Sequence, residues 1–145
     1  MHNNDTMKTD LSLQLAERMY AALDADDIPN FLALCAEEVT VEYPGRGVLP
    51  YGGTWEGRDG AERFLDTHEG AEEILQFDVE RMIAEDDTVL VLGTFTGRAK
   101  PDGQEWSTRF VHQLTMTDAG LLRWEAFFDT AAAVAARQMG GPRLV

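Results

Sequence analysis

His112 is the residue in this sequence with the clearest capacity for chemistry. It lies in segment 106–116, WSTRFVHQLTM, where apolar and polar residues alternate as in a half-buried β-strand. The even positions form the apolar face, which includes Trp106, Phe110 and His112. Apolar surroundings favour the neutral form of an imidazole, which can donate or accept a proton. The pattern therefore offers His112 as a pocket acid, base or hydrogen-bond donor, or as a core histidine satisfied by a buried hydroxyl or carbonyl.

Tyr43 is the second candidate for a functional side chain. It ends the predicted strand 39–43, VTVEY, on its apolar face, directly before the Pro- and Gly-rich segment 44–57. A long loop of this kind often carries function. A buried tyrosine needs a partner for its hydroxyl, and here the partner could be His112 or a ligand. The alternative is a tyrosine that only packs at the end of the strand.

Other residue types that can do chemistry favour structural roles. Cys35 is the single cysteine, which excludes an intramolecular disulfide and a Cys-cluster metal site. Its place on an apolar stripe with helical spacing predicts a buried, inert thiol rather than a nucleophile. Segment 68–73, HEGAEE, puts a histidine among carboxylates without metal spacing, so we interpret it as a solvated acidic surface. No nucleophile-elbow, P-loop or dinucleotide-binding motif occurs, and we expect no metal and no cofactor.

Length and charge exclude several classes of protein. A chain of 145 residues predicts one domain over 1–145, with its core at about 10–135 and both ends frayed. The formal charge of −14 repels phosphate backbones and anionic lipid, so we expect no nucleic-acid or membrane partner. No apolar run approaches the roughly 18 residues of a membrane span, and the start, MHNNDTMKTD, lacks a signal-peptide core. We therefore expect a cytoplasmic protein.

The elements that position these residues follow an α+β order. Apolar spacing predicts helices at about 10–23, 27–36 and 58–69, with the strand 39–43 between the second and the third. From residue 73 the period changes to two, which predicts four antiparallel strands and then a helix over 131–139. The first of these strands, 73–84, should turn one side to the core with Leu75, Phe77, Val79 and Ile83, and the last should do so with Leu122, Trp124, Ala126 and Phe128.

The opposite face of the predicted sheet is also apolar. It would expose Leu90, Leu92, Val111 and Phe127. Large exposed apolar patches usually mark an interface, and a second copy of the sheet would cover this one. We therefore expect a homodimer through the outer face of the sheet.

Three segments resemble nuclear transport factor 2-like proteins of the SnoaL-like group. They are 23–45, LDADDIPNFLALCAEEVTVEYPG, 54–65, TWEGRDGAERFL, and 110–130, FVHQLTMTDAGLLRWEAFFDT. The resemblance implies a cone-shaped α+β barrel, with a curved, mostly antiparallel sheet packed on three N-terminal helices around an internal pocket, usually as a dimer. This fold hosts ketosteroid isomerases, limonene epoxide hydrolases, polyketide cyclases, dehydratases and noncatalytic binders, so it predicts architecture better than reaction.

The resemblance does not carry over the catalytic residues of two of these enzyme classes. The general base of the ketosteroid isomerases corresponds to Tyr43, their oxyanion-holding tyrosine to Met19, and their protonated Asp to His112. The epoxide hydrolases match Trp124, but their acid corresponds to Ala126, and their Arg and its partner Asp correspond to Gly93 and Phe95. Polyketide cyclases use pocket acid–base groups that include a histidine, which His112 resembles.

Two functions compete on this evidence. The first is a cofactor-free enzyme that moves protons through His112, with Tyr43 orienting it, to isomerise, cyclise, dehydrate or hydrolyse a hydrophobic cyclic substrate. The second is a noncatalytic binding or regulatory module for an apolar metabolite, and a third option is a dimeric scaffold whose own side chains fill the cavity. For either of the first two, we expect the pocket to be lined by Met19, Tyr20, Trp55, Phe64, Phe95, Trp106, Phe110, Trp124 and Phe128.

Overall fold

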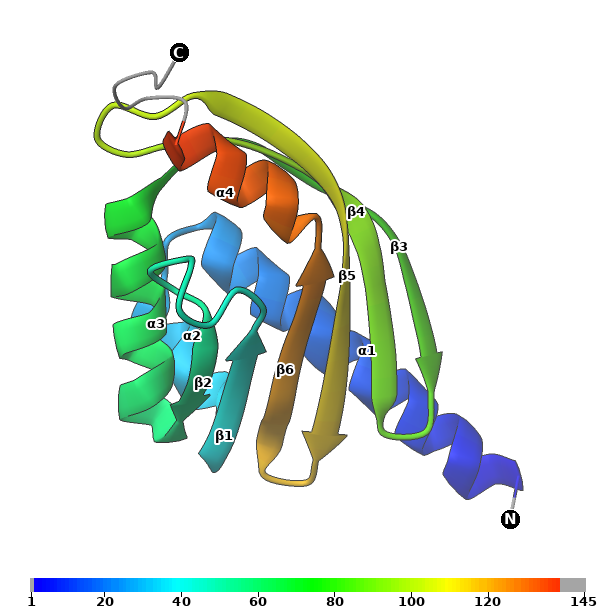
Figure 1. The fold of residues 1–145 in the computed structure, drawn as a ribbon. Helices are drawn as coiled ribbons and strands as arrows, with labels where there is room; N and C mark the ends of the chain where they lie inside the picture. The colour runs from blue at the N-terminus through cyan, green and yellow to red at the C-terminus, as the bar shows by residue number, and fades with distance from the viewer. Residues whose placement is uncertain (1, 139–145) are drawn as a thin grey trace.

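The chain folds as helices packed against one curved sheet. The computed structural model describes residues 2–138, with side chains from residue 6 onward. Its elements are α1 His2–Asp24, α2 Ile28–Leu34, β1 Cys35–Tyr43, β2 Gly53–Glu56, α3 Gly57–Ala71, β3 Glu72–Glu85, β4 Thr88–Ala99, β5 Glu105–Thr117, β6 Gly120–Phe128 and α4 Thr130–Gln138. Helix α3 packs on β1, α1 contacts β3 and β4, and α4 contacts β5 and β4 (Figure 1). None of the described helices is long and apolar enough to cross a membrane.

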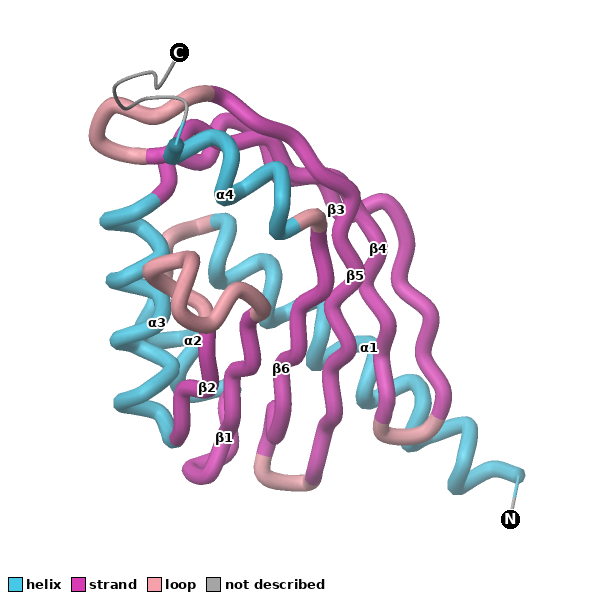
Figure 2. Tube along the Cα trace, in the orientation of Figure 1, coloured by secondary structure: helices cyan, strands magenta, loops and turns pink. Residues whose placement is uncertain are grey.

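The sheet is open and has six strands in the order β2-β1-β6-β5-β4-β3 (Figure 2). Strands β1 and β6 are parallel, and every other neighbouring pair is antiparallel. The parallel pair joins the N-terminal part of the chain to its last strand, with Val41 opposite Trp124. The curved sheet and the helices therefore enclose an interior space, which confirms the expected cone-shaped α+β architecture.

Strand β2 lies inside the segment that we predict as a loop. It pairs antiparallel with β1, with Trp55 opposite Val41 and Gly53 opposite Tyr43. Gly52 lies so close to the preceding turn that an added Cβ would lie 2.4 Å from the carbonyl oxygen of Gly45. These glycines let the chain fold back on itself and return as a strand. Four residues after a glycine-rich turn give too short an alternation to be recognised in the sequence.

Helix α2 ends before Cys35, so the predicted helix to residue 36 is too long. Cys35 is the first residue of β1, opposite Leu121 of β6, and not part of a helical stripe. Its side chain is fully buried, and its thiol donates to the carbonyl oxygen of Phe31 at 3.4 Å. Burial raises the pKa of the thiol to about 12, and the nearby Arg58 lowers it by less. A thiol with this pKa stays protonated near neutral pH, as expected of an inert cysteine.

Two irregularities in β3 change which of its side chains face inward. The pairing with β4 shifts between Ile74 and Gln76, which removes Leu75 from the regular alternation, and shifts again after Val79. Ile83 therefore pairs with the partly exposed Leu90, on the outer face of the sheet. The prediction that Leu75 and Ile83 share the inner face with Phe77 is wrong, because each bulge adds a residue to one strand only.

A bulge between β5 and β6 has the same effect on the last strand. The register shifts between Thr115 and Met116, and Leu121 becomes fully buried while Leu122 stays partly exposed. Leu122 is therefore not on the inner face that we predict for it. Beyond the bulge the alternation holds, and Trp124 and Ala126 are buried.

The outer face of the sheet carries the apolar side chains expected there. Phe127 is 47% exposed, and Leu90, Leu92 and Val111 are partly exposed. The homodimer through this face stays a prediction, and the mass of the protein in solution, measured by sedimentation, tests it. A monomeric mass at micromolar concentration would contradict it.

Candidate functional site

A cavity of about 510 Å³ lies between the sheet and the helices. Most of the predicted pocket residues line it: Tyr20, Tyr43, Phe64, Phe95, Trp106, Phe110, His112, Trp124 and Phe128. They come from α1, α3 and strands β1, β4, β5 and β6, which the parallel pairing of β1 with β6 brings together. A space of this volume suits a small organic molecule, and it contradicts a scaffold whose own side chains fill the interior.

Met19 and Trp55 do not line this cavity. Met19 is fully buried in the hydrophobic core, whereas the next residue on α1, Tyr20, turns its ring into the cavity. Trp55 lies on β2 and packs with its ring centroid 5.9 Å from that of Phe64, and Phe64 in turn packs 5.5 Å from Trp124. Its indole N–H donates to the carbonyl oxygen of Tyr51 at 3.1 Å.

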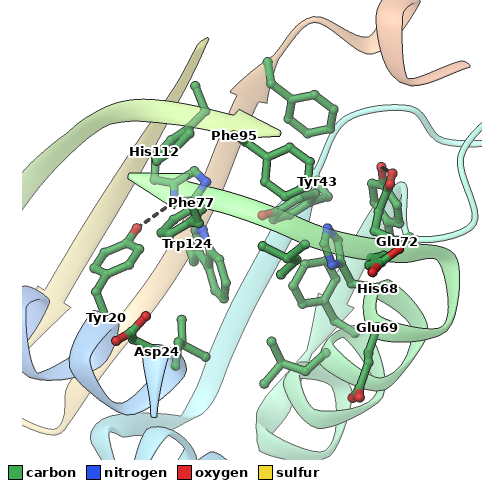
Figure 3. A pocket seen from close by; sticks show the side chains of 18 of the residues that line it. Tyr20, Asp24, Tyr43, His68, Glu69, Glu72, Phe77, Phe95, His112 and Trp124 are labelled. Carbon is green, nitrogen blue, oxygen red and sulfur yellow. Dashed lines mark hydrogen bonds between the residues drawn. The ribbon is translucent and has the colours of Figure 1, made fainter. Parts of the chain in front are cut away.

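His112 is held at one end of the cavity by a hydrogen bond to Tyr20. The two atoms, Nδ1 of His112 and the Tyr20 hydroxyl oxygen, are 2.6 Å apart, and Figure 3 shows the contact as a dashed line. Burial lowers the pKa of His112 to about 3, and the nearby His68 lowers it further. Burial also raises the pKa of Tyr20 well above its usual value, to which Tyr43 adds. Both side chains are therefore neutral near neutral pH.

We assign the tautomer of His112 from the hydrogen-bond partners of Tyr20. The Tyr20 hydroxyl has no other acceptor among the described residues, so its proton is used only if the O–H donates to Nδ1. The imidazole proton then resides on Nε2, which has no protein partner in residues 2–138. His112 consequently presents an N–H donor, rather than a lone pair, on the side of the ring away from Tyr20.

Trp124 lines the same wall, with its N–H group buried. Its Nε1 is buried and has no hydrogen-bond partner among the described residues. Leaving such a donor unpaired costs about 1–3 kcal/mol. The Trp124 ring lies 5.5 Å from that of His112 and 5.8 Å from that of Tyr43, measured between centroids.

Tyr43 occupies the middle of the cavity and is not the partner of His112. Its ring centroid is 6.3 Å from that of His112, and Nδ1 of His112 is already taken by Tyr20. The Tyr43 hydroxyl makes no hydrogen bond within the described part of the chain. Burial raises the pKa of Tyr43 above its usual value, so the hydroxyl stays protonated and can donate to a ligand.

The other end of the cavity holds a buried carboxylate that the sequence analysis misses. Glu72 is 1% exposed, and its two oxygens accept hydrogen bonds from three side chains. Trp106 donates to Oε1 at 3.0 Å, Tyr51 donates to Oε2 at 2.8 Å, and Arg137 of α4 forms an ion pair with Oε2. Because its acceptor sites are occupied and its charge is paired, Glu72 serves structure better than proton transfer.

His68 lies beside this carboxylate and also lines the cavity. Our interpretation of 68–73 as a solvated acidic surface is therefore wrong for His68 and Glu72, although Glu69 and Glu73 are exposed. The His68 ring packs 4.6 Å from that of Tyr51, centroid to centroid. Within residues 2–138, no group of three or more His, Cys, Asp or Glu side chains is placed to hold a metal ion.

Removing the Tyr20 hydroxyl should allow His112 to adopt both neutral tautomers. We expect Tyr20→Phe to lower the free energy of unfolding by about 1–2 kcal/mol, because it leaves Nδ1 of His112 without its buried donor. Nitrogen-15 spectra of the histidine rings should change from a single Nε2–H form to a mixture of tautomers. Met19→Leu, an isosteric change in the core one residue away, should leave the ring spectrum unchanged. An unaltered His112 tautomer in Tyr20→Phe would contradict this account of the pair.

Comparison with known proteins agrees with this architecture. The family described as the SnoaL-like domain matches residues 16–124. An NTF2-like protein from Burkholderia xenovorans LB400 is 26% identical, with a TM-score of 0.81 over 88% of this chain and 96% of that one. TerC, co-crystallized with polyporic acid, is 27% identical, with a TM-score of 0.75 over 88% of this chain and 98% of that one.

A second Burkholderia protein gives the same result, and the curated proteins add none. An NTF2-like protein of unknown function from Burkholderia pseudomallei K96243 is 26% identical, with a TM-score of 0.78 over 86% of this chain and 95% of that one. No curated protein matches the chain at significant similarity. The family match extends from the middle of α1 to Trp124 in β6 and so spans most of the elements that form the cavity. On this evidence the chain belongs to the SnoaL-like domain family.

Proposed function

We propose that this protein binds a hydrophobic cyclic molecule in its cavity and transforms it by acid–base chemistry without a cofactor. The observation that carries the proposal is the Tyr20–His112 pair, which holds a neutral imidazole in one tautomer inside an aromatic cavity. The reaction classes that fit are isomerisation, cyclisation, dehydration and hydrolysis. Each needs an oxygen atom to gain negative charge in the transition state, and a positioned N–H donor stabilises that charge.

The role of His112 in such a reaction follows from its hydrogen bond. With Nδ1 occupied by Tyr20, Nε2–H can donate to a carbonyl oxygen of the substrate. Burial keeps the ring neutral, and its apolar neighbours strengthen the electrostatic effect of the donor because little water screens it. Flat aromatic walls such as Phe110 and Phe77 favour a planar substrate.

The relatives support a small-molecule ligand. TerC was crystallised with an organic acid, polyporic acid, and it shares 27% of its sequence with this chain across nearly its whole length. The charged side chains that line the cavity of this protein favour a ligand other than an organic acid. Asp24, Asp26, Glu69 and Glu73 line the cavity with Lys100 as the opposing cation, so we expect neutral ligands to be preferred over anions.

The second candidate function is a binding module that leaves its ligand unchanged. One observation favours it: the carboxylate at the far end of the cavity, Glu72, is fully engaged with Tyr51, Trp106 and Arg137. A binder needs only shape and a few donors, all of which the cavity offers. The two functions differ in whether a proton moves.

Hydrogen–deuterium exchange separates the two functions without knowledge of the natural substrate. We expect the protein to accelerate exchange of the α-protons of 1-tetralone, a neutral bicyclic ketone, in D2O at neutral pH, as followed by proton NMR. General acid–base catalysis is worth about 10²-fold or more, so the rate should clearly exceed that in buffer alone. His112→Phe should abolish the acceleration, and Gln113→Ala, an exposed neighbour on the same strand, should retain it. Binding of 1-tetralone without any exchange would support the binding module instead.

A further inference from the structure

The exposed apolar side chains of this protein are concentrated at one edge of the sheet. Most of the large apolar side chains that are exposed among the described residues lie on α1 and β3, and only Val48 and Phe127 lie elsewhere. The two elements are neighbours, because Thr9 and Ser12 of α1 form hydrogen bonds with Asp86, directly after β3. Apolar patches of this kind usually mark an interface. The side chains are Met7 and Leu11 on α1, and Ile74, Leu75, Phe77, Val79 and Ile83 on β3.

Strand β3 is also an unpaired edge of the sheet. It stands last in the strand order, so that only β4 pairs with it, and Figure 1 shows it at the margin of the sheet. Residues 73–81 of this strand are exposed without interruption. The backbone N–H and C=O groups that point away from β4 therefore lack a strand partner among the described residues. A strand from another chain can supply these hydrogen bonds.

A bulge makes two charged side chains of β3 complementary to a second copy of the strand. Asp78 and Arg81 are three residues apart, which would place them on opposite faces of a regular strand. The register shift after Val79 instead brings Arg81 opposite Leu92, two positions from Thr94, which lies opposite Asp78. Both charged side chains therefore lie on the outer face of the sheet. Neither forms an ion pair with another described residue.

We infer that the β3 strands of two copies pair antiparallel about Val79, so that the sheet continues from one copy into the other. With Glu80 as the bulged residue of each strand, a two-fold axis at Val79 places Asp78 opposite the partner's Arg81. Symmetry forms this charge pair twice. Charged residues normally discourage pairing at a sheet edge, but here their order favours one register and one occupant, a second copy of this chain.

The inferred pair borders the cavity. Ile74 and Phe77 line the cavity and are 56% and 38% exposed, so this side of the cavity reaches the edge of the sheet. The same register sets Phe77 opposite the partner's Met82 on the inner face. Side chains directly opposite each other on paired strands are in contact. The partner thus covers a cavity-lining residue that the single chain leaves exposed.

Charge reversal tests the pair, with the mass in solution measured by sedimentation at a series of micromolar concentrations. All variants carry Phe127→Glu, which puts a carboxylate on the outer face, so that association through that face is not counted. In this background we expect a dimer. Asp78→Arg or Arg81→Asp alone should raise its dissociation constant at least about fourfold, because each turns two favourable cross-strand pairs into unfavourable ones. Both changes together should restore the dimer, because opposite charges face each other again.

Asp66→Arg is the matched control. It makes the same change in net charge as Asp78→Arg, at an exposed position of α3, and should leave the dissociation constant of the background unaltered. A monomer throughout in the Phe127→Glu background, or a double reversal that dissociates as readily as the single ones, would overturn the inference. Neither result would touch the proposed function, which rests on the interior of one chain.

Amide exchange on the unaltered protein guards against a misfolded variant. The backbone N–H groups of residues 76–82 that point away from β4 should exchange more slowly as the protein concentration rises, because pairing takes them out of water. Pairing through the outer face of the sheet leaves these groups in water. Exchange that does not depend on concentration would show that the edge stays unpaired, and the inference would be wrong.

Discussion

The protein should lose roughly 4 kcal/mol of unfolding free energy as the pH falls from 6.5 to 4.5. Burial lowers the pKa of His112 to about 3 and that of His68 to about 4 in the folded state. In the unfolded chain both rings recover a pKa near 6.5. Below pH 6.5 the unfolded state therefore binds protons that the folded state does not, and acid favours unfolding. The contribution of the two histidines is fully present above pH 6.5 and is lost as the pH falls towards their folded-state pKa values.

Urea unfolding followed by circular dichroism at a series of pH values measures this loss. His112→Phe and His68→Phe should each remove about half of the stability loss that the two histidines cause between pH 6.5 and 4.5. All other titratable groups are the same in the three proteins, so differences between their pH profiles come from the two histidines. Equal stability of the wild type at pH 6.5 and pH 4.5 would show that the imidazoles reach solvent and titrate normally in the folded protein.

Arg137→Met should destabilise the fold by about 3–5 kcal/mol, because it leaves a buried carboxylate without its cation. The Arg137 side chain is 17% exposed, and that of its partner, Glu72, is fully buried. The guanidinium also lies over the Tyr51 ring, 5.5 Å from its centroid, and donates to the carbonyl oxygen of Ala133 within α4. The substitution therefore removes the ion pair that links α4 to the start of β3 at the far end of the cavity.

A surface ion pair between β4 and the next residue of β3, Glu73, provides the control for this prediction. Arg98 forms an ion pair with Glu73 at 2.9 Å, but the two side chains are 44% and 51% exposed. Exposed pairs contribute about 0–1 kcal/mol, so Arg98→Met should have little effect on chemical unfolding. The double variant Glu72→Gln with Arg137→Met should recover much of the lost unfolding free energy, because it also removes the buried, unpaired negative charge of Glu72. Equal effects of Arg137→Met and Arg98→Met would mean that the Glu72 carboxylate is not isolated from water.

The inward position of His112 was predictable because β5 keeps a regular alternation. From Trp106 to Thr115 no bulge interrupts its pairing with β4, so counting by twos places the imidazole on the same face as Phe110 and Leu114. The same counting fails in β3 and at the start of β6, where bulges shift Ile83 and Leu122 to the other face. A bulge depends on the backbone geometry of two paired strands, and the sequence of one strand does not reveal it.

His68 was missed for a different reason. Its local sequence is acidic, and composition suggested a solvated surface. The helical spacing carried the opposite signal, because His68 is four residues after Phe64 and seven after Ala61, both buried. Its neighbour Glu72 could not have been placed from sequence, since its burial depends on Arg137, which is far away in the chain. Spacing along a helix was thus the better guide than composition.

The parallel pairing of β1 with β6 has a consequence for folding during synthesis on the ribosome. Val41 meets Trp124, and Tyr20 meets His112, only after nearly the whole chain has been made. Until then β1 has an unpaired edge, and Phe31 lacks the indole that it packs against. Contacts between residues so distant in sequence form slowly, and such edges favour association with other chains. We therefore expect slower translation, or a chaperone that shields nascent chains, to raise the yield of folded protein more than substitutions at the surface would.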